Sequence, residues 1–149
     1  MRILPLSQTE CSDLLKRISV GRLACSLDDQ PYIVPVAFSF EADGIYIFST
    51  LGKKVEWMRK NPKVCLQADE IESRSSWSSV IVMGTYLELT ELHHHVQREF
   101  ARKRLAQHSH WWQSALAERR EQTDDLAIQP VFFRVEVTSM SGLRTAPDA

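Results

Sequence analysis

Two adjacent lysines near position 50 follow residues with small or hydroxyl side chains, and together these residues could bind a phosphate. Ser49 and Thr50 form a hydroxyl pair, Gly52 has no side chain, and Lys53 and Lys54 carry positive charge. In the first turn of a helix, cations oppose the helix macrodipole by roughly 0.3–1 kcal/mol each. A phosphate there would instead meet free backbone N–H groups and two ammonium groups together. The pattern predicts a phosphate site, and the alternative is a pair of solvated surface lysines.

A short strand and a short helix must position the lysine pair. The apolar residues 45–48 predict a strand that ends at the hydroxyl pair. Leu51, Val55 and Met58 then recur at helical spacing, which predicts an amphipathic helix. Serine and threonine are favoured N-caps, so we expect the hydroxyl pair to cap this helix.

The remaining apolar segments predict antiparallel strands joined by short turns. These strands are expected over residues 22–27, 32–40, 64–68, 79–89 and 131–137. Residues 69–78 read as a polar loop and residues 144–149 as a frayed tail. Proline cannot donate to a ladder, so Pro35 predicts an edge or a bulge, and Gly84 predicts a bulge or a barrel corner. The strand pattern predicts a mainly β fold with flanking helices and a small barrel.

Two further helices are expected. Ser7 opens a Ser-x-x-Glu pattern typical of a capping box, and this helix is expected to end near Ser19. Thr90 and Glu91 can cap a helix that bears the apolar residues Leu92, Val96 and Phe100. In the polar segment that follows, Trp111 and Trp112 favour a core edge or an oligomer contact over a ligand stack.

Length and composition bound the class of protein. The chain has 149 residues, 44% hydrophobic and 25% charged, with a formal net charge of −1. One domain over 1–149 is expected, and the charge balance argues against nucleic-acid or membrane binding. The three cysteines form no C-x-x-C pair, no segment resembles a signal peptide or a membrane span, and a cytoplasmic protein is expected. We expect Cys25 and Cys65 to be buried packing residues.

Several kinds of catalytic site are excluded. Residues 93–95 are three consecutive histidines, which project about 100° apart on a helix and cannot converge on one ion, so no metal site is predicted. The motifs of serine hydrolases, phosphate-binding loops, dinucleotide folds and zinc proteases are absent. No residue is identified as a proton donor.

Four segments, taken in order, resemble one known family. They are Val-Gly-Arg-Leu-Ala-Cys at 20–25, Tyr-Ile-Val-Pro-Val at 32–36, Tyr-Ile-Phe-Ser-Thr-Leu-Gly-Lys-Lys at 46–54 and Asn-Pro-Lys-Val-Cys at 61–65. The chain resembles, over about residues 7–143, the FMN-binding split-barrel family related to pyridoxamine 5′-phosphate oxidase. It is most similar to the flavin-binding branch that includes nitroimidazole-resistance proteins.

This resemblance implies a six-stranded antiparallel split β-barrel, a homodimer, and FMN held in a cleft at the dimer interface. In such proteins the positions matching Lys53 and Lys54 bind the phosphate. The positions that approach the flavin ring or ribityl chain match Val34, Pro35, Val36, Ala37, Phe48, Ser49, Thr50, Trp77, Ser78 and Ser79.

Three departures from the family narrow the expected reaction. True pyridoxamine-phosphate oxidases have an Arg-Gln pair where this chain has Ser78 and Ser79, and an Arg-x-His motif near the C-terminus that this chain lacks. Oxidation of that vitamer is therefore not expected. Nitroimidazole-resistance proteins have a histidine where this chain has Phe48, so nitroreduction is left open without support.

The resulting expectation is an FMN-dependent oxidoreductase. It would pass electrons from a reduced nicotinamide or similar donor to a small aromatic or quinone-like substrate, with the chemistry supplied by the cofactor. The alternatives are a module that binds or senses flavin, haem or deazaflavin without turnover, and a structural dimer whose cleft has lost its ligand.

Overall fold

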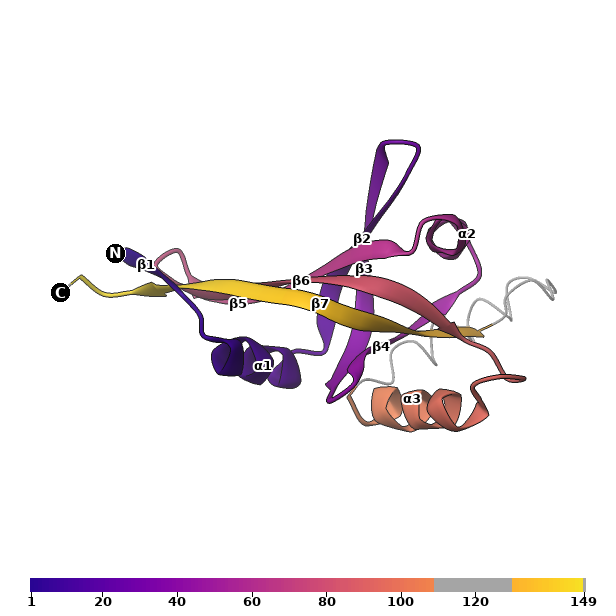
Figure 1. The fold of residues 1–149 in the computed structure, drawn as a ribbon. Coiled ribbons are helices and arrows are strands. Elements are labelled where there is room, and N and C mark those ends of the chain that lie inside the picture. The colour runs from indigo at the N-terminus through magenta and orange to yellow at the C-terminus, as the bar shows by residue number, and fades with distance from the viewer. Residues whose placement is uncertain (109–129, 149) are drawn as a thin grey trace, which may run out of the picture.

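The computed structural model describes residues 1–108 and 130–148, which form seven strands and three helices (Figure 1). Trp111 and Trp112 lie outside the described residues. In chain order the elements are β1 (Arg2–Pro5), α1 (Gln8–Arg17), β2 (Val20–Leu27), β3 (Gln30–Glu41), β4 (Gly44–Thr50), α2 (Lys53–Lys60), β5 (Lys63–Ser73), β6 (Ser76–Leu89), α3 (His95–His108) and β7 (Pro130–Ala146). Within the described part of the chain, no helix has the length and apolar character needed to cross a membrane.

The strands form one antiparallel sheet in the order β1-β7-β4-β3-β2-β5-β6. Because β6 also pairs with β7, six of the seven strands close into a ring. The expected mainly β fold with flanking helices is confirmed. The short strand β1, which pairs with β7 outside the ring, was not predicted from the sequence.

Two apolar clusters hold the fold together. On β4, Ile45 and Ile47 point into the ring, whereas Tyr46 and Phe48 point outward, beneath α3, as the period of two along a strand requires. We call the second cluster the α3 core. Its buried members are Tyr46, Phe48, Leu89, Ala101, Leu105 and Phe132.

The first helix is confirmed. Ser7 caps α1, because the backbone N–H of Glu10 donates to Ser7 Oγ at 3.1 Å and the backbone N–H of Ser7 donates to a Glu10 carboxylate oxygen at 3.1 Å. The helix ends at Arg17, two residues earlier than expected. Its buried face, Cys11, Leu14 and Leu15, packs on the ring core.

The start of α3 differs from the prediction. Thr90 Oγ1 accepts from the backbone N–H of His93 at 3.2 Å, but this closes a turn, and the helix begins only at His95. Leu92 and Val96 are 85% and 80% exposed. The buried helical residues are Ala101 and Leu105, and Phe100 is partly buried against the α3 core, so the expectation for Phe100 is confirmed. Leu92 lies in the turn before the helix, so counting from it did not identify the face that packs inward.

Most of the expected polar loop and the first part of the expected frayed tail lie in strands. Residues 69–73 and 76–78 extend β5 and β6 into a long hairpin, and residues 144–146 extend β7. These extensions, the adjoining paired residues 79–83 of β6 and 139–143 of β7, and β1 form a stretch that we call the arm, which runs toward the N- and C-termini in Figure 1. Arg2 pairs with Ala146, and the backbone N–H of Trp77 donates to Thr145 Oγ1 at 3.0 Å. Polar residues alternate here on exposed faces, so the hydrophobic pattern that marks a strand was missing.

The cysteines differ in accessibility. Cys11 and Cys25 are buried, and burial raises the pKa of both thiols. Cys65 is only half-buried, contrary to expectation, because its neighbours Val64 and Leu66 fill the inward positions of β5 and turn Cys65 outward.

We expect Cys65 to be the thiol that reacts first in the folded protein. At pH 8 a thiol-specific reagent should label one cysteine rapidly and all three after denaturation, because the thiolate is the reactive form and needs access. Peptide mapping identifies the site. Rapid labelling of Cys25 in the folded protein would contradict the burial described here.

Candidate functional site

The helix that carries the lysine pair begins without a side-chain cap. β4 continues through Thr50, which pairs with Pro130, and the Ser49 hydroxyl donates to the Thr50 carbonyl at 3.0 Å. The N-cap is Gly52, and no described side chain bonds to the free N–H groups of this turn. The expected capping by the hydroxyl pair is therefore wrong, because pairing with β7 holds Thr50 in the sheet. Among the described residues, a Cβ atom at Gly52 would meet nothing within 4 Å, so no described atom crowds the backbone at this N-cap.

The two lysines lie in different surroundings. Lys53 is exposed, and its Nζ lies 5.4 Å from the centroid of the Tyr32 ring and 5.5 Å from that of Trp57. Lys54 is half-buried and lies close enough to Cys25 on β2 to lower the pKa of that thiol, although burial raises this pKa more. The structure therefore places both lysine side chains in the first turn of α2, as the sequence predicted.

The aromatic pair beside Lys53 was not predicted as part of the site. The rings of Tyr32, from β3, and Trp57, from α2, have centroids 5.7 Å apart and are inclined by 55°. Lys53 and Trp57 are four residues apart on one helix, so their contact could have been inferred from spacing alone. The contribution of Tyr32 depends on how α2 packs and leaves no local signal in the sequence.

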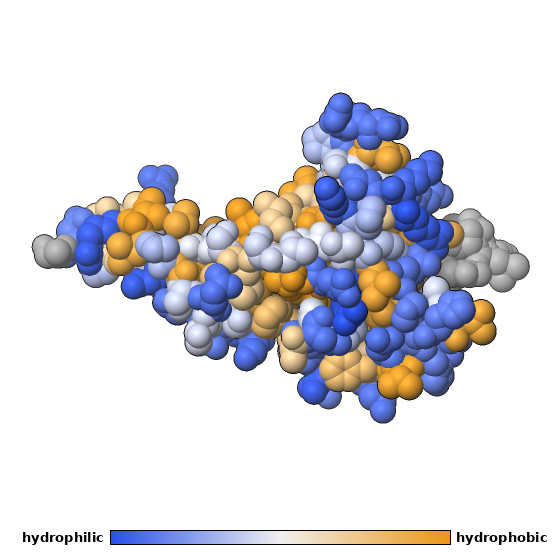
Figure 2. Space-filling view, in the orientation of Figure 1, coloured by the Kyte–Doolittle hydropathy of each residue, from blue (hydrophilic) through white to orange (hydrophobic). Residues whose placement is uncertain are grey.

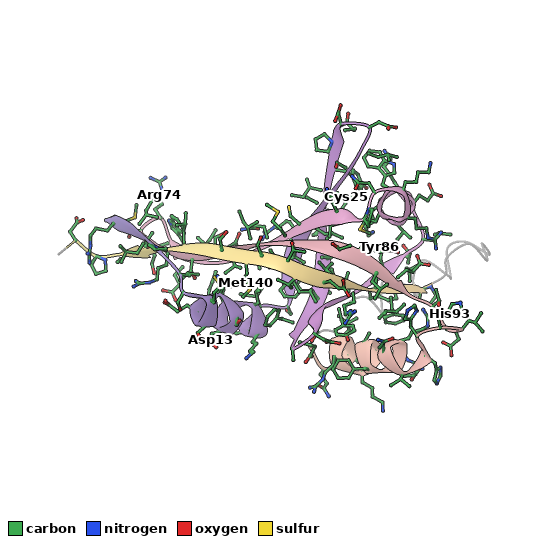
Figure 3. All side chains as sticks on the ribbon, viewed as in Figure 1. Asp13, Cys25, Arg74, Tyr86, His93 and Met140 are labelled. Atoms are coloured by element: carbon green, nitrogen blue, oxygen red, sulfur yellow. The ribbon has the colours of Figure 1, made fainter. Side chains whose placement is uncertain are left out.

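A polar network fixes the other end of α2. Arg59 donates to both carboxylate oxygens of Glu88 on β6, at 2.8 and 3.2 Å, and the Tyr86 hydroxyl donates to Glu88 at 2.6 Å. Asn61 Nδ2 donates to the Ser26 carbonyl at 3.0 Å. Figure 3 labels Cys25 and Tyr86 in the region of α2. The helix is therefore tied to β2 and β6, which holds the lysines in position.

Because of this network, the stability of the folded protein should decrease at acid pH. Partial burial raises the pKa of Glu88, but hydrogen bonds from Arg59 and Tyr86 lower it more, so the net shift is downward. A carboxyl whose pKa is lowered by folding contributes stability above its unfolded pKa and loses it as pH falls through the folded value. We expect Glu88→Gln to flatten the decline in melting temperature below about pH 4.5, near the ordinary glutamate pKa. The same decline in both proteins would show that Glu88 is not linked to folding.

One edge of β3 is open next to this helix. Residues 30–37 of β3 pair with β2, but only residues 38–41 pair with β4. Over 31–37, therefore, one side of the strand has no ladder partner among the described residues. Pro35 lies in this part and is exposed, which confirms its expected edge position. Val34 is half-buried, and Val36 and Ala37 are each 3% exposed, so a ligand here would meet mainly backbone.

The two aromatic positions of the expected site lie away from the lysines. Phe48 points into the α3 core, where it makes an edge contact with Phe132 at 5.4 Å between centroids. Trp77 lies on the arm, near the hairpin tip that Arg74 marks in Figure 3. From Trp77 to Thr85, which pairs with Lys63 just beyond α2, β6 runs eight residues, or about 26 Å.

The serines beside Trp77 face opposite sides of the arm. Ser78 borders a polar cavity of about 310 Å³ against α1, whereas Ser79 borders a more apolar hollow of about 480 Å³ on the other face. Ser79 Oγ also accepts from Gln67 Nε2 at 3.0 Å. The structure therefore brings together the β3 edge, the end of β4 and the lysines, but a single chain does not add residues 77–79 to them.

Apolar side chains are exposed on the arm. Figure 2 shows hydrophobic residues on its surface. Ile81 and Met83 on β6 are 42% and 50% exposed, Leu143 on β7 is 48% exposed, and Ile71 on β5 is 68% exposed.

A closed antiparallel ring with a lysine-bearing helix beside an open strand edge defines a small β protein with a candidate phosphate site. Residues 7–144 match the family model described as pyridoxamine 5′-phosphate oxidase, and the chain belongs to this family. The expected family resemblance is confirmed.

The relatives with the higher identities cover nearly the whole chain. An uncharacterized protein of Rhizobium meliloti (strain 1021) is 40% identical over 139 residues, covering 92% of this chain and 91% of the relative. A crystal structure described as an FAD-binding protein from Mesorhizobium loti is 39% identical, with a TM-score of 0.81, covering 98% of this chain and 100% of that one.

More distant structures share the fold. An FAD-binding protein from Mycobacterium smegmatis has a TM-score of 0.64 at 23% identity, covering 96% of this chain and 100% of that one. A candidate 5-nitroimidazole antibiotic resistance protein from Bacteroides thetaiotaomicron has a TM-score of 0.68 at 17% identity, covering 97% and 89%.

Proposed function

We propose that this protein is a flavoprotein that binds FMN, or the FMN half of a larger flavin, and acts as an oxidoreductase. The observation that carries the proposal is the lysine pair at a helix start that has no side-chain cap and no described atom within 4 Å of a Cβ at Gly52, with the open edge of β3 beside it. Membership of the family and a 39% identical relative described as an FAD-binding protein support the choice of a flavin.

The residues present fit a flavin phosphate. Lys53 and Lys54 supply two cations, and the first turn of α2 supplies free N–H groups, so a dianion would receive several charge-assisted hydrogen bonds. The edge of β3 over residues 31–37 has no ladder partner among the described residues, and it would offer carbonyl acceptors and N–H donors of its non-proline residues to the flavin ring. A bound flavin supplies the electron-transfer chemistry, and the protein orients it and limits its exposure to water.

The proposed assembly is a homodimer of split barrels with the flavin between the subunits. Residues 77–79 of the same chain lie on the distant arm, so they reach the flavin only if a second copy brings them. The exposed apolar residues of the arm support pairing, because monomers rarely expose such side chains in groups. Light scattering on flavin-loaded protein at micromolar concentration should give twice the chain mass, and a monomer that retains flavin would refute an interface site.

The proposed reaction takes electrons from a reduced nicotinamide or similar donor and delivers them to a small aromatic or quinone-like acceptor. Three free cysteines fit a reducing compartment, and a cytoplasmic location is part of the proposal. The test is the absorbance spectrum of purified protein with added FMN or FAD, followed by NADH or NADPH without air and then a quinone.

The enzyme hypothesis predicts flavin bands that bleach with the donor and return with the quinone. Bound flavin that no donor reduces would identify a storage or sensing module instead. A Soret band would identify a haem protein. Failure to take up either flavin would refute the proposal altogether.

A further inference from the structure

We propose that Tyr32 and Trp57 form a subsite for the adenosine diphosphate end of FAD, next to the flavin phosphate. This inference rests on the proposed function, because it extends the same site past Lys53. The relative from Mesorhizobium loti is described as an FAD-binding protein, which makes FAD the dinucleotide to test.

The geometry places two partly exposed rings at the phosphate position. The Lys53 ammonium lies almost equally far from the two ring centroids, at 5.4 and 5.5 Å. A phosphate bound to Lys53 would therefore be close enough to both rings for a base attached to the same nucleotide to reach them. Tyr32 and Trp57 are half-buried, and both pack on the ring core, so their positions are fixed while part of each ring faces outward.

The chemistry of the three side chains suits an adenosine diphosphate group. Aromatic rings stack on nucleobases, and the inclination of 55° between these two leaves a wedge rather than a closed sandwich. An exposed cation–π contact is weaker than a charge-assisted hydrogen bond, so a diphosphate would draw the Lys53 ammonium off the rings. That movement would uncover ring surface for the adenine.

Other parts of the molecule provide fewer reasons for a ligand. In the polar cavity beside Ser78, Arg17 already pairs with Glu70, and Arg144 lies 3.7 Å from Glu10, so these charges compensate one another. At Lys53 the cation is exposed and its partners are aromatic rings, which a phosphate could replace. The aromatic pair is therefore the better candidate.

The test compares dissociation constants for FAD, FMN and riboflavin in the wild-type protein and in Trp57→Ala and Trp57→Phe. We expect the wild type to bind FAD about 10- to 100-fold more tightly than FMN, from the usual contribution of a stacked base. Trp57→Ala should remove most of this preference and leave FMN affinity within about threefold, and Trp57→Phe should retain most of it. Circular dichroism and melting temperature verify that each variant is folded.

The possible outcomes separate this inference from the proposed function. If FMN binds but FAD binds no more tightly, the subsite is refuted and the flavin proposal stands. If neither flavin binds, the proposed function fails first. The adenosine diphosphate of a nicotinamide donor is the other source of this chemistry. A higher KM for NADH in FMN-loaded Trp57→Ala, with the FAD preference unchanged, would assign the rings to the donor and overturn the FAD assignment.

Discussion

Replacing Lys53 and Lys54 together with alanine should weaken FMN binding by about 2–4 kcal/mol, which corresponds to roughly 30- to 700-fold in the dissociation constant. Each charge-assisted hydrogen bond contributes about 1.5–3 kcal/mol, and neighbouring contributions are not fully additive. The effect should be large because α2 begins without a side-chain cap, so the lysines and the free N–H groups would act on the same phosphate.

The controls for this prediction use another ligand and another lysine pair. Riboflavin lacks the phosphate, so its affinity should change much less in the double variant. Replacing Lys60 and Lys63, which are exposed at the other end of α2, removes the same net charge without touching the helix start. Flavin fluorescence quenching measures all of these constants. If the dissociation constant for FMN is the same in both double variants and the wild type, Lys53 and Lys54 are ordinary surface lysines.

Gly84→Ala should lower the stability of the fold by about 3 kcal/mol, at the upper end of the usual cost of overpacking a core. A Cβ atom at Gly84 would lie 2.4 Å from Val135 Cγ1 and 2.5 Å from the Glu136 carbonyl oxygen. Neither atom can move away easily, because the first belongs to a stiff β-branched side chain and the second to the backbone of β7. The register of β6 against β7 shifts at this position, so the variant would also disturb a bulge that the sequence predicted.

Gly52→Ala is the matched control for Gly84→Ala. Its Cβ would have no described atom within 4 Å, and the backbone at Gly52 is extended, with a φ of 178° that any residue adopts. We expect a loss of less than about 1 kcal/mol, which reflects the poorer N-cap. Urea unfolding gives both values, and equal losses at the two glycines would show that the tight contact at Gly84 relaxes without cost.

The sequence predicted the helices and strands whose residue pattern follows from contacts between neighbours in the chain or from one buried face. The capping box at Ser7 fixed the start of α1, and the alternation from Tyr32 to Phe40 identified β3 because one face of that strand fills the ring. Pro35 and Gly84 were informative for the same reason, since one lacks an N–H group and the other lacks a side chain.

The arm and the details of the site could not be predicted in this way. Along residues 69–73 both faces of β5 are at least partly exposed, and four of the five residues are polar, so the segment resembles a loop. The hydroxyl pair was expected to cap α2, but pairing between distant strands decides where β4 ends. The contact of Tyr32 with Lys53 likewise depends on tertiary packing.

The family resemblance predicted that residues 77–79 lie at the same site as the lysine pair, but within one chain these residues are far apart. Trp77 and Ser79 belong to the arm, and the lysine pair belongs to α2, so their expected proximity requires a second copy of the chain. Spacing within one sequence contains no information about contacts between two molecules. This part of the site therefore stays a prediction until the assembly is measured.

The pairing of β7 with three other strands has a consequence for the order of folding. β7 pairs with β1, β4 and β6, and it lies after all of them in the chain. During synthesis, before β7 has been added, one edge of β4 and one edge of β6 lack their partner strand, and the ring cannot close. Unpaired edges and exposed apolar surface make such nascent chains prone to aggregate, so this protein should depend on chaperones until its last strand emerges.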